Sequence, residues 1–188
     1  MRSNVSARRV ATLGALLAIS LVLSVVESML GALVPLPIPG VKLGLANIVS
    51  MFILVYFSLP SALVIALLRT LLAALLTGGL SIFLFSAPGA ILSILLMWIA
   101  MRFVPPLSLV GVSMVGAVAH NLAQVCVAVL ITGEVNLFYY AFVLTAVGAV
   151  SGSITGIVAG ATFSRAAGAL CIKEQAPHIL QSNQGGAR

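Results

Sequence analysis

Residues 10–34 read VATLGALLAISLVLSVVESMLGALV, an apolar run in which Glu27 is the single charged side chain. A helix needs about 20 apolar residues to cross the ~30 Å hydrocarbon core of a bilayer. The apolar region of a cleaved signal peptide is shorter than this run, and further apolar runs follow it. The stretch therefore predicts a retained first transmembrane helix.

Five more apolar runs follow, at residues 43–57, 60–77, 88–103, 107–131 and 137–163. The first connection, Pro35–Gly40, has alternate prolines, which exclude a helix there. The second run is short, which predicts a helix that starts below the membrane surface or is packed against its neighbours. We predict an all-α polytopic membrane protein with a terminus at 1–9, six transmembrane helices within 10–163, and a mobile tail at 164–188.

The composition excludes a water-soluble domain, because 62% of the residues are hydrophobic and 6% are charged. Soluble domains contain roughly 25% charged residues. The net charge of +6 does not indicate nucleic-acid binding, since the cations lie mainly at the ends of apolar runs and no basic groove with interleaved aromatics is present. The two cysteines have no metal-type spacing, so neither a metal site nor a disulfide is predicted.

Basic residues choose the orientation of the six helices. An even number of spans places both termini on one side, and most of the cations then share that side: Arg2, Arg8, Arg9, Arg102, Arg165, Lys173 and Arg188. The opposite side receives only Lys42. The positive-inside rule therefore places both termini in the cytoplasm, with the protein in the cell membrane.

Several polar residues occur inside the apolar runs, where a charged side chain costs roughly 2.5–3.5 kcal/mol on insertion scales. These residues are Glu27, Asn47, Arg69, His120, Asn121 and Gln124, with Lys42 at the head of the second run. At 1.5 Å per residue, Glu27 lies about 8 Å to the outer side of its helix centre, and Gln124 about 6 Å outward of His120. All are predicted in the middle and outer half of the bilayer.

Two interpretations fit this layer of polar groups. It is either a site for a small polar or amphiphilic ligand that enters from outside, or a Glu27–Arg69 ion pair with His120 and Gln124 as interhelical hydrogen-bonding groups. We favour the site, because interhelical bonding rarely needs so many polar groups at one depth.

Small residues form two stripes that predict helix contacts. Gly148, Gly152, Gly156 and Gly160 recur at every fourth position of the sixth run. Ala7, Ala11 and Ala15 do so in the first. Such stripes let a neighbouring backbone approach closely, so the glycines predict packing within the bundle, or a docking face.

Motifs for catalysis and for ATP binding are absent from the sequence. It has no aspartate, whereas the usual prenyl-diphosphate synthases bind Mg²⁺ and diphosphate through aspartate-rich clusters. It also has no phosphate-binding GxxxxGK[ST] loop and no HExxH motif. We therefore predict no cofactor and no enzymatic activity of the chain alone, and any energy-driven transport would require a partner.

Three stretches carry a family resemblance: PGVKLGLANI at 39–48, ALLR at 66–69 and GAVAHNLAQ at 116–124. Together they resemble the Gx transporter family, often labelled heptaprenyl diphosphate synthase component I, over about residues 9–160. That family is similar to the substrate-binding S components of energy-coupling-factor (ECF) transporters. The resemblance implies six helices, a ligand site near the outer face covered by the Pro35–Gly40 loop, and a first-helix AxxxA surface, here Ala7, Ala11 and Ala15. This surface would dock on a transmembrane coupling subunit driven by two ATPases.

We therefore predict a membrane-embedded substrate-binding subunit that captures a small ligand from the outer face. The predicted ligand-binding residues are Lys42, Asn47, Arg69, His120, Asn121 and Gln124, with Glu27 orienting Arg69. The alternative is the non-catalytic component I of heptaprenyl diphosphate synthase in isoprenoid or menaquinone side-chain synthesis. It would hold the hydrophobic tail while a soluble synthase subunit performs the chemistry. A third possibility is a purely structural membrane protein.

Overall fold

The computed structural model describes residues 2–32, 44–77, 79–104 and 107–170, and within these ranges it contains no β-strand. Its elements are α1 (Arg2–Ala32), α2 (Asn47–Tyr56), α3 (Leu59–Thr77), α4 (Leu80–Phe103), α5 (Leu109–Thr132), the 3-10 turn η1 (Val135–Leu137) and α6 (Phe138–Leu170). The all-α prediction with six helices is therefore confirmed.

Five of these helices, all except α2, contain a stretch long enough and apolar enough to cross a membrane. The chain is thus a multi-pass membrane protein. The exception, α2, has 10 residues, a length of about 15 Å. Nine of its residues are buried, and it contacts each of the other five helices. The prediction that the second run is short and packed against its neighbours is confirmed.

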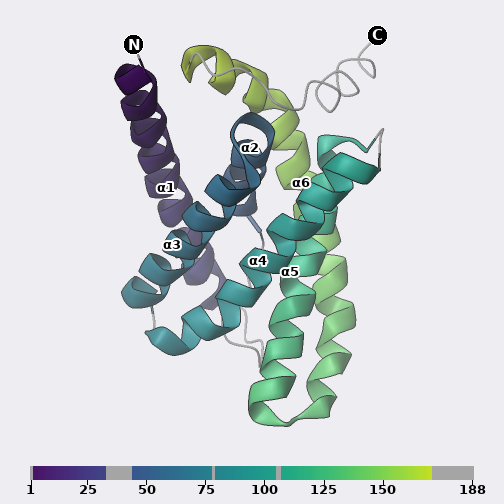
Figure 1. Cartoon of the computed structure of the whole chain (residues 1–188). Helices are drawn as coiled ribbons and strands as arrows, with labels where there is room; N and C mark the ends of the chain where they lie inside the picture. Colours follow the sequence, from purple (N-terminus) through teal and green to yellow (C-terminus); the bar gives the residue numbers. More distant parts are fainter. Residues whose placement is uncertain (1, 33–43, 78, 105–106, 171–188) are drawn as a thin grey trace.

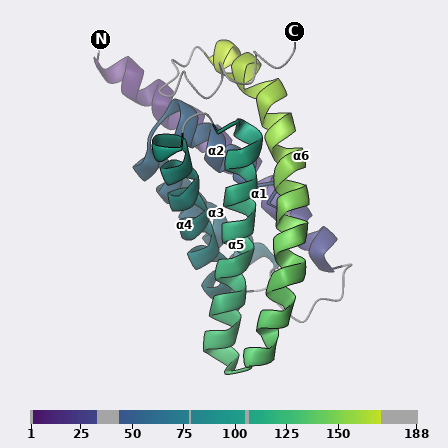
Figure 2. The same ribbon diagram turned by 90° about the vertical axis from the view of Figure 1, so that its right-hand side faces the viewer.

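The start of α1 and the end of α6 lie at the same end of the bundle, which we call the terminal end (Figure 1). The helices α5 and α6 run antiparallel, side by side, and turn at the opposite end, which we call the hairpin end (Figure 2). The short α2 occupies the half of the bundle nearest the terminal end (Figure 1). It therefore fills only part of the length of the bundle.

An apolar core surrounds α2 in this half of the bundle. The ring centroid of Phe52 lies 5.1 Å from that of Phe163 on α6, in an edge-on arrangement, and 4.6 Å from that of Tyr56. Leu16, Met97 and other buried side chains from α1, α3, α4 and α5 complete this terminal cluster. The half of the bundle at the terminal end is thus filled by packed apolar side chains.

A smaller hairpin cluster lies toward the other end. It consists of Phe85 on α4, Val125 and Ala128 on α5, and Leu144 on α6. Because these helices are consecutive in the chain, local hairpins are enough to form this cluster. The two clusters leave a middle level of the bundle between them.

The fourth helix begins before Pro88, the residue that we predicted to start it. We expected it to start at Pro88, but α4 starts at Leu80 and contains Pro88 in its interior. A proline removes one backbone hydrogen bond from a helix. Ending the helix within the membrane would leave several backbone groups without partners in lipid, so a membrane helix tolerates the proline.

The glycines of α6 pack directly on α5. A Cβ atom added at Gly152 would lie 2.7 Å from the Cα atom of Met114 and 2.9 Å from the carbonyl oxygen of Ser113. Added Cβ atoms at Gly148 and Gly156 would likewise meet the backbone of α5. Beside these contacts, the hydroxyl groups of Ser113 and Thr155 are hydrogen-bonded at 2.6 Å. The absence of side chains on this stripe therefore sets the close approach of α5 and α6.

Replacing Gly152 by Ala should destabilise the protein, because the new methyl group would collide with backbone atoms that cannot rotate away. Overpacking of this kind costs about 1–3 kcal/mol. The matched control is Gly14→Ala on α1, since a Cβ atom there would meet nothing within 4 Å. Thermal unfolding in detergent should show a clear loss for Gly152→Ala and no loss for Gly14→Ala. Equal melting temperatures would contradict this account of the α5–α6 contact.

Candidate functional site

Polar side chains occupy the level between the terminal cluster and the hairpin cluster. Along α5, Leu109 and Val112 belong to the terminal cluster and Val125 belongs to the hairpin cluster. His120, Asn121 and Gln124 fall between them on the same helix and are buried. The order of residues along α5 thus places a polar level between two apolar ones.

Six of the predicted site residues are buried in the interior of the bundle, and we call them the polar layer. Each is at most 5% exposed: Glu27 on α1, Asn47 on α2, Arg69 on α3, and His120, Asn121 and Gln124 on α5. Four different helices contribute, and none of the six side chains faces lipid. The seventh predicted residue, Lys42, and the Pro35–Gly40 loop lie outside the described residues.

The Glu27 carboxylate holds the backbone at the start of α2. Its Oε1 atom accepts hydrogen bonds from the backbone N–H groups of Gly44 and of Leu45, the latter at 3.0 Å. Gly44 has a φ of +89°, a conformation that favours glycine. The helix therefore begins inside the bundle, and Glu27 satisfies two backbone donors of the turn that precedes it.

Arg69 lies close enough to Glu27 for their charges to attract each other. Burial of one charge without the other would be costly, so this proximity stabilises both. The Nε and Nη1 atoms of Arg69 nevertheless have no hydrogen-bond partner among the described residues. The guanidinium group thus retains donors that the described protein atoms do not use.

Two neighbouring residues of α5 face different helices. The His120 ring lies against Gly89 of α4, where an added Cβ atom would be 3.2 Å from the ring atoms Nδ1 and Cε1. Asn121 donates a hydrogen bond from Nδ2 to the carbonyl oxygen of Leu144 on α6, at 3.0 Å. Its Oδ1 atom has no partner among the described residues. The polar layer therefore reaches both helices that flank α5.

Three serines that our sequence analysis missed are also buried and polar: Ser24 on α1, and Ser86 and Ser93 on α4. Most other buried or half-buried hydroxyl groups in the helices bond to a carbonyl of the preceding turn, as Ser28 and Thr70 do. The hydroxyl groups of these three have no partner among the described residues. Serine alone is too common in membrane helices to be a signal, but Ser24 lies one turn before Glu27 on the same helix face.

The alanine stripe of α1 lies on the surface instead. Ala7, Ala11 and Ala15 are exposed, as are Gly14 and Ala18 beside them. Within the described residues, α1 packs mainly against α3, with a smaller contact to α2. One face of α1 is therefore open to lipid or to another protein.

The polar layer and the three buried serines together offer guanidinium, amide and hydroxyl groups. Across the described part of the chain, no three His, Cys, Asp or Glu side chains converge as they would around a metal ion. Guanidinium, amide and hydroxyl groups suit the oxygen atoms of a polar ligand, since Arg binds carboxylate and phosphate groups particularly well.

Replacing Glu27 should destabilise the start of α2. Glu27→Leu leaves the N–H groups of Gly44 and Leu45 without an acceptor, and hydrogen bonds to a charged group contribute about 1.5–3 kcal/mol each. Glu27→Gln keeps an acceptor oxygen and should lose less. Thermal unfolding in detergent should therefore rank stability as wild type, then Glu27→Gln, then Glu27→Leu. A Glu27→Leu variant as stable as the wild type would contradict the assigned role.

A protein-family model matches this chain. The family model described as heptaprenyl diphosphate synthase component I matches residues 16–162, a range that includes the whole polar layer. No curated protein and no solved structure gives a significant match. Since the match covers most of the sequence, the chain belongs to the heptaprenyl diphosphate synthase component I family.

Proposed function

We propose that this protein is a membrane-embedded substrate-binding subunit, similar to the S component of an ECF transporter, and that the polar layer is its ligand site. The observation that carries this proposal is the set of buried polar atoms without partners among the described residues. They belong to Arg69, Asn47 and Asn121 and to three serines. A ligand with several oxygen atoms would use these groups together.

Unsatisfied polar groups are costly inside a bilayer. Each buried donor or acceptor without a partner costs roughly 1–3 kcal/mol in proteins. A structural role for the layer would favour the replacement of such groups by apolar ones, which pack at no such cost. A site that is filled by ligand or water has a reason to keep them.

The position of the terminal cluster supports entry of the ligand from one side of the membrane. Packed aromatic and aliphatic side chains around α2 block the half of the bundle at the terminal end. With the termini in the cytoplasm, as the distribution of basic residues favours, the ligand would enter from the outer face. We therefore propose capture from outside the cell.

The chain would depend on a partner for energy, since its sequence has no ATP-binding loop. The exposed face of α1, with Ala7, Ala11 and Ala15, is suited to dock on a transmembrane coupling subunit that two ATPases drive. Small residues permit close approach between helices, which is how many membrane helices associate.

A second candidate function follows from the family description, which names heptaprenyl diphosphate synthase component I. In this role the protein would be a non-catalytic membrane subunit that holds a prenyl chain for a soluble synthase. Purification of the protein from its own membrane separates the two candidates. A co-purifying coupling subunit with ATPases favours the first, and a soluble synthase whose activity rises in the complex favours the second.

Arg69→Lys should weaken ligand binding while it retains the positive charge near Glu27. Lysine cannot replace the Nε and Nη1 donors, and a hydrogen bond to a charged group is worth about 1.5–3 kcal/mol, or roughly 10–100-fold in affinity. Native mass spectrometry of the protein from its own membrane should detect a bound small molecule in the wild type and a strong loss in the variant.

The control for this experiment is Ser113→Ala. Ser113 is a buried polar residue of α5 whose hydroxyl group is bonded within the protein, to Thr155. This variant should lose some thermal stability and retain the ligand. A wild-type protein without bound ligand, or equal occupancy in Arg69→Lys, would contradict the proposed site.

Ala11→Leu on α1 should abolish co-purification of the partner while the protein stays folded, because the larger side chain prevents close helix approach. The matched control is Ala161→Leu, since Ala161 is an exposed alanine on α6. Equal recovery of the partner with both variants would assign the docking surface to another part of the protein.

A further inference from the structure

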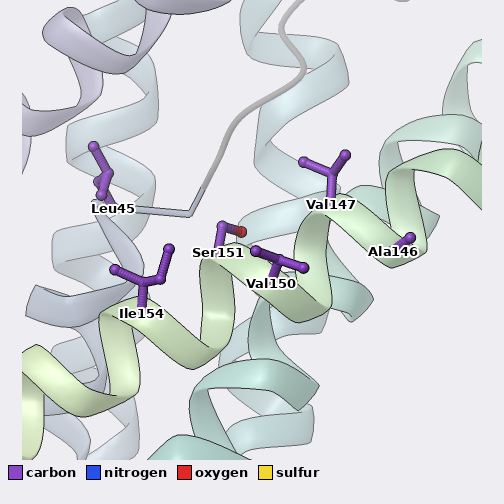
Figure 3. A pocket seen from close by; sticks show the side chains of 6 residues that line it. All are labelled: Leu45, Ala146, Val147, Val150, Ser151 and Ile154. Atoms are coloured by element: carbon purple, nitrogen blue, oxygen red, sulfur yellow. The ribbon is translucent and has the colours of Figure 1, made fainter.

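An apolar groove of about 450 Å³ lies on the outside of α6. Its lining consists of Leu45, Ala146, Val147, Val150, Ser151 and Ile154 (Figure 3). Pockets that bind small molecules commonly measure about 300–1,000 Å³. The single hydroxyl group among these side chains, that of Ser151, is hydrogen-bonded to the carbonyl oxygen of Gly148. The groove therefore offers a hydrocarbon surface.

The groove begins beside the polar layer and extends from it toward the terminal end. On the side of α6 that packs on α5, the Leu144 carbonyl accepts a hydrogen bond from Asn121, and Thr155 is bonded to Ser113. These two contacts with α5 bracket the groove-lining residues of α6, which run from Ala146 to Ile154. The polar layer and the groove are therefore neighbours across the wall of the bundle.

Leu45 contacts both the polar layer and the groove. Its backbone N–H group donates to Glu27 at 3.0 Å, inside the polar layer. Its side chain forms the wall of the groove that faces α6 (Figure 3). A molecule that contacts both sides of Leu45 would have a polar end in the bundle and an apolar end in the membrane.

We propose that the groove holds the hydrocarbon chain of a single-chain amphiphile whose oxyanion head lies in the polar layer. The head is assigned by complementary charge, since Arg69 is buried and has donors without partners in the described protein. The chain is assigned by the apolar lining and by the membrane around it. Among the described residues, the groove is lined by one helix and by Leu45, which suits a single chain. This inference rests on the proposed ligand site and names its substrate class.

The test measures binding of prenyl diphosphates of two lengths, farnesyl and dimethylallyl, to the full-length protein in nanodiscs. The informative variant is Val150→Phe, because Val150 lines the groove and is 64% exposed, so that a larger ring there fills the groove without disturbing the core. The matched control is Val158→Phe, the same substitution on the same helix at a half-exposed residue that does not line the groove.

We expect Val150→Phe to lower the affinity for farnesyl diphosphate at least tenfold, and Val158→Phe to change it less than twofold. Because both variants share one bilayer, partition of the long chain into lipid cancels in this comparison. Arg69→Lys should lower the affinity for both diphosphates, since each has the same head.

Three results would overturn the inference. One is equal farnesyl affinity in Val150→Phe and Val158→Phe while dimethylallyl diphosphate still binds, which leaves the proposed ligand site intact. Another is displacement of farnesyl diphosphate by phosphatidylglycerol at equal concentration, which would assign the groove to bulk lipid. The third is no binding of either diphosphate to the wild type. If the protein from its own membrane also has no bound ligand, the proposed function fails as well.

Discussion

The bonds from the Glu27 carboxylate to the backbone at Gly44 and Leu45 determine how this bundle is built. A helix that begins inside a membrane protein has several backbone N–H groups that neither lipid nor its own first turn can satisfy. A carboxylate supplied by α1 satisfies the N–H groups of Gly44 and Leu45 in the turn that leads into α2, and the positive charge of Arg69 nearby compensates the carboxylate. One buried acid thus permits a short helix in the centre of the fold.

The short α2 has a direct consequence for the interior. Where α2 is present, its aromatic and aliphatic side chains fill the space between the longer helices and form the terminal cluster. The helix α2 begins at Asn47, and the buried side chains of α1, α3 and α5 include polar groups together with small apolar ones such as Ala73 and Ala123. The packed terminal cluster therefore follows from the position and length of one helix.

The sequence predicted the six helices, because long apolar runs and the prolines and glycines between them are strong signals in a membrane protein. It also picked out Arg69 and His120, since a charged or ionisable group is costly in lipid. The predicted start of α4 was wrong because Pro88 was taken as the first residue of the helix. The hydrogen-bond partners of Glu27 were missed because they are backbone N–H groups, which every residue type except proline carries. Ser24, Ser86 and Ser93 were missed because their unused hydroxyl groups become evident only when the bonds of other serines are known.

The helices of the bundle differ in how tightly they pack, and this difference indicates which of them can move. Glycines bring α6 against α5, and such a contact between two backbones leaves no space for a ligand. On the other side, α1 packs mainly on α3, and the backbone near Leu45 is held through Glu27. A side chain outside a packed helix pair can move more easily than the pair itself. Any opening from the polar layer to the groove is therefore expected at Leu45 and α1, while α5 and α6 remain a rigid wall.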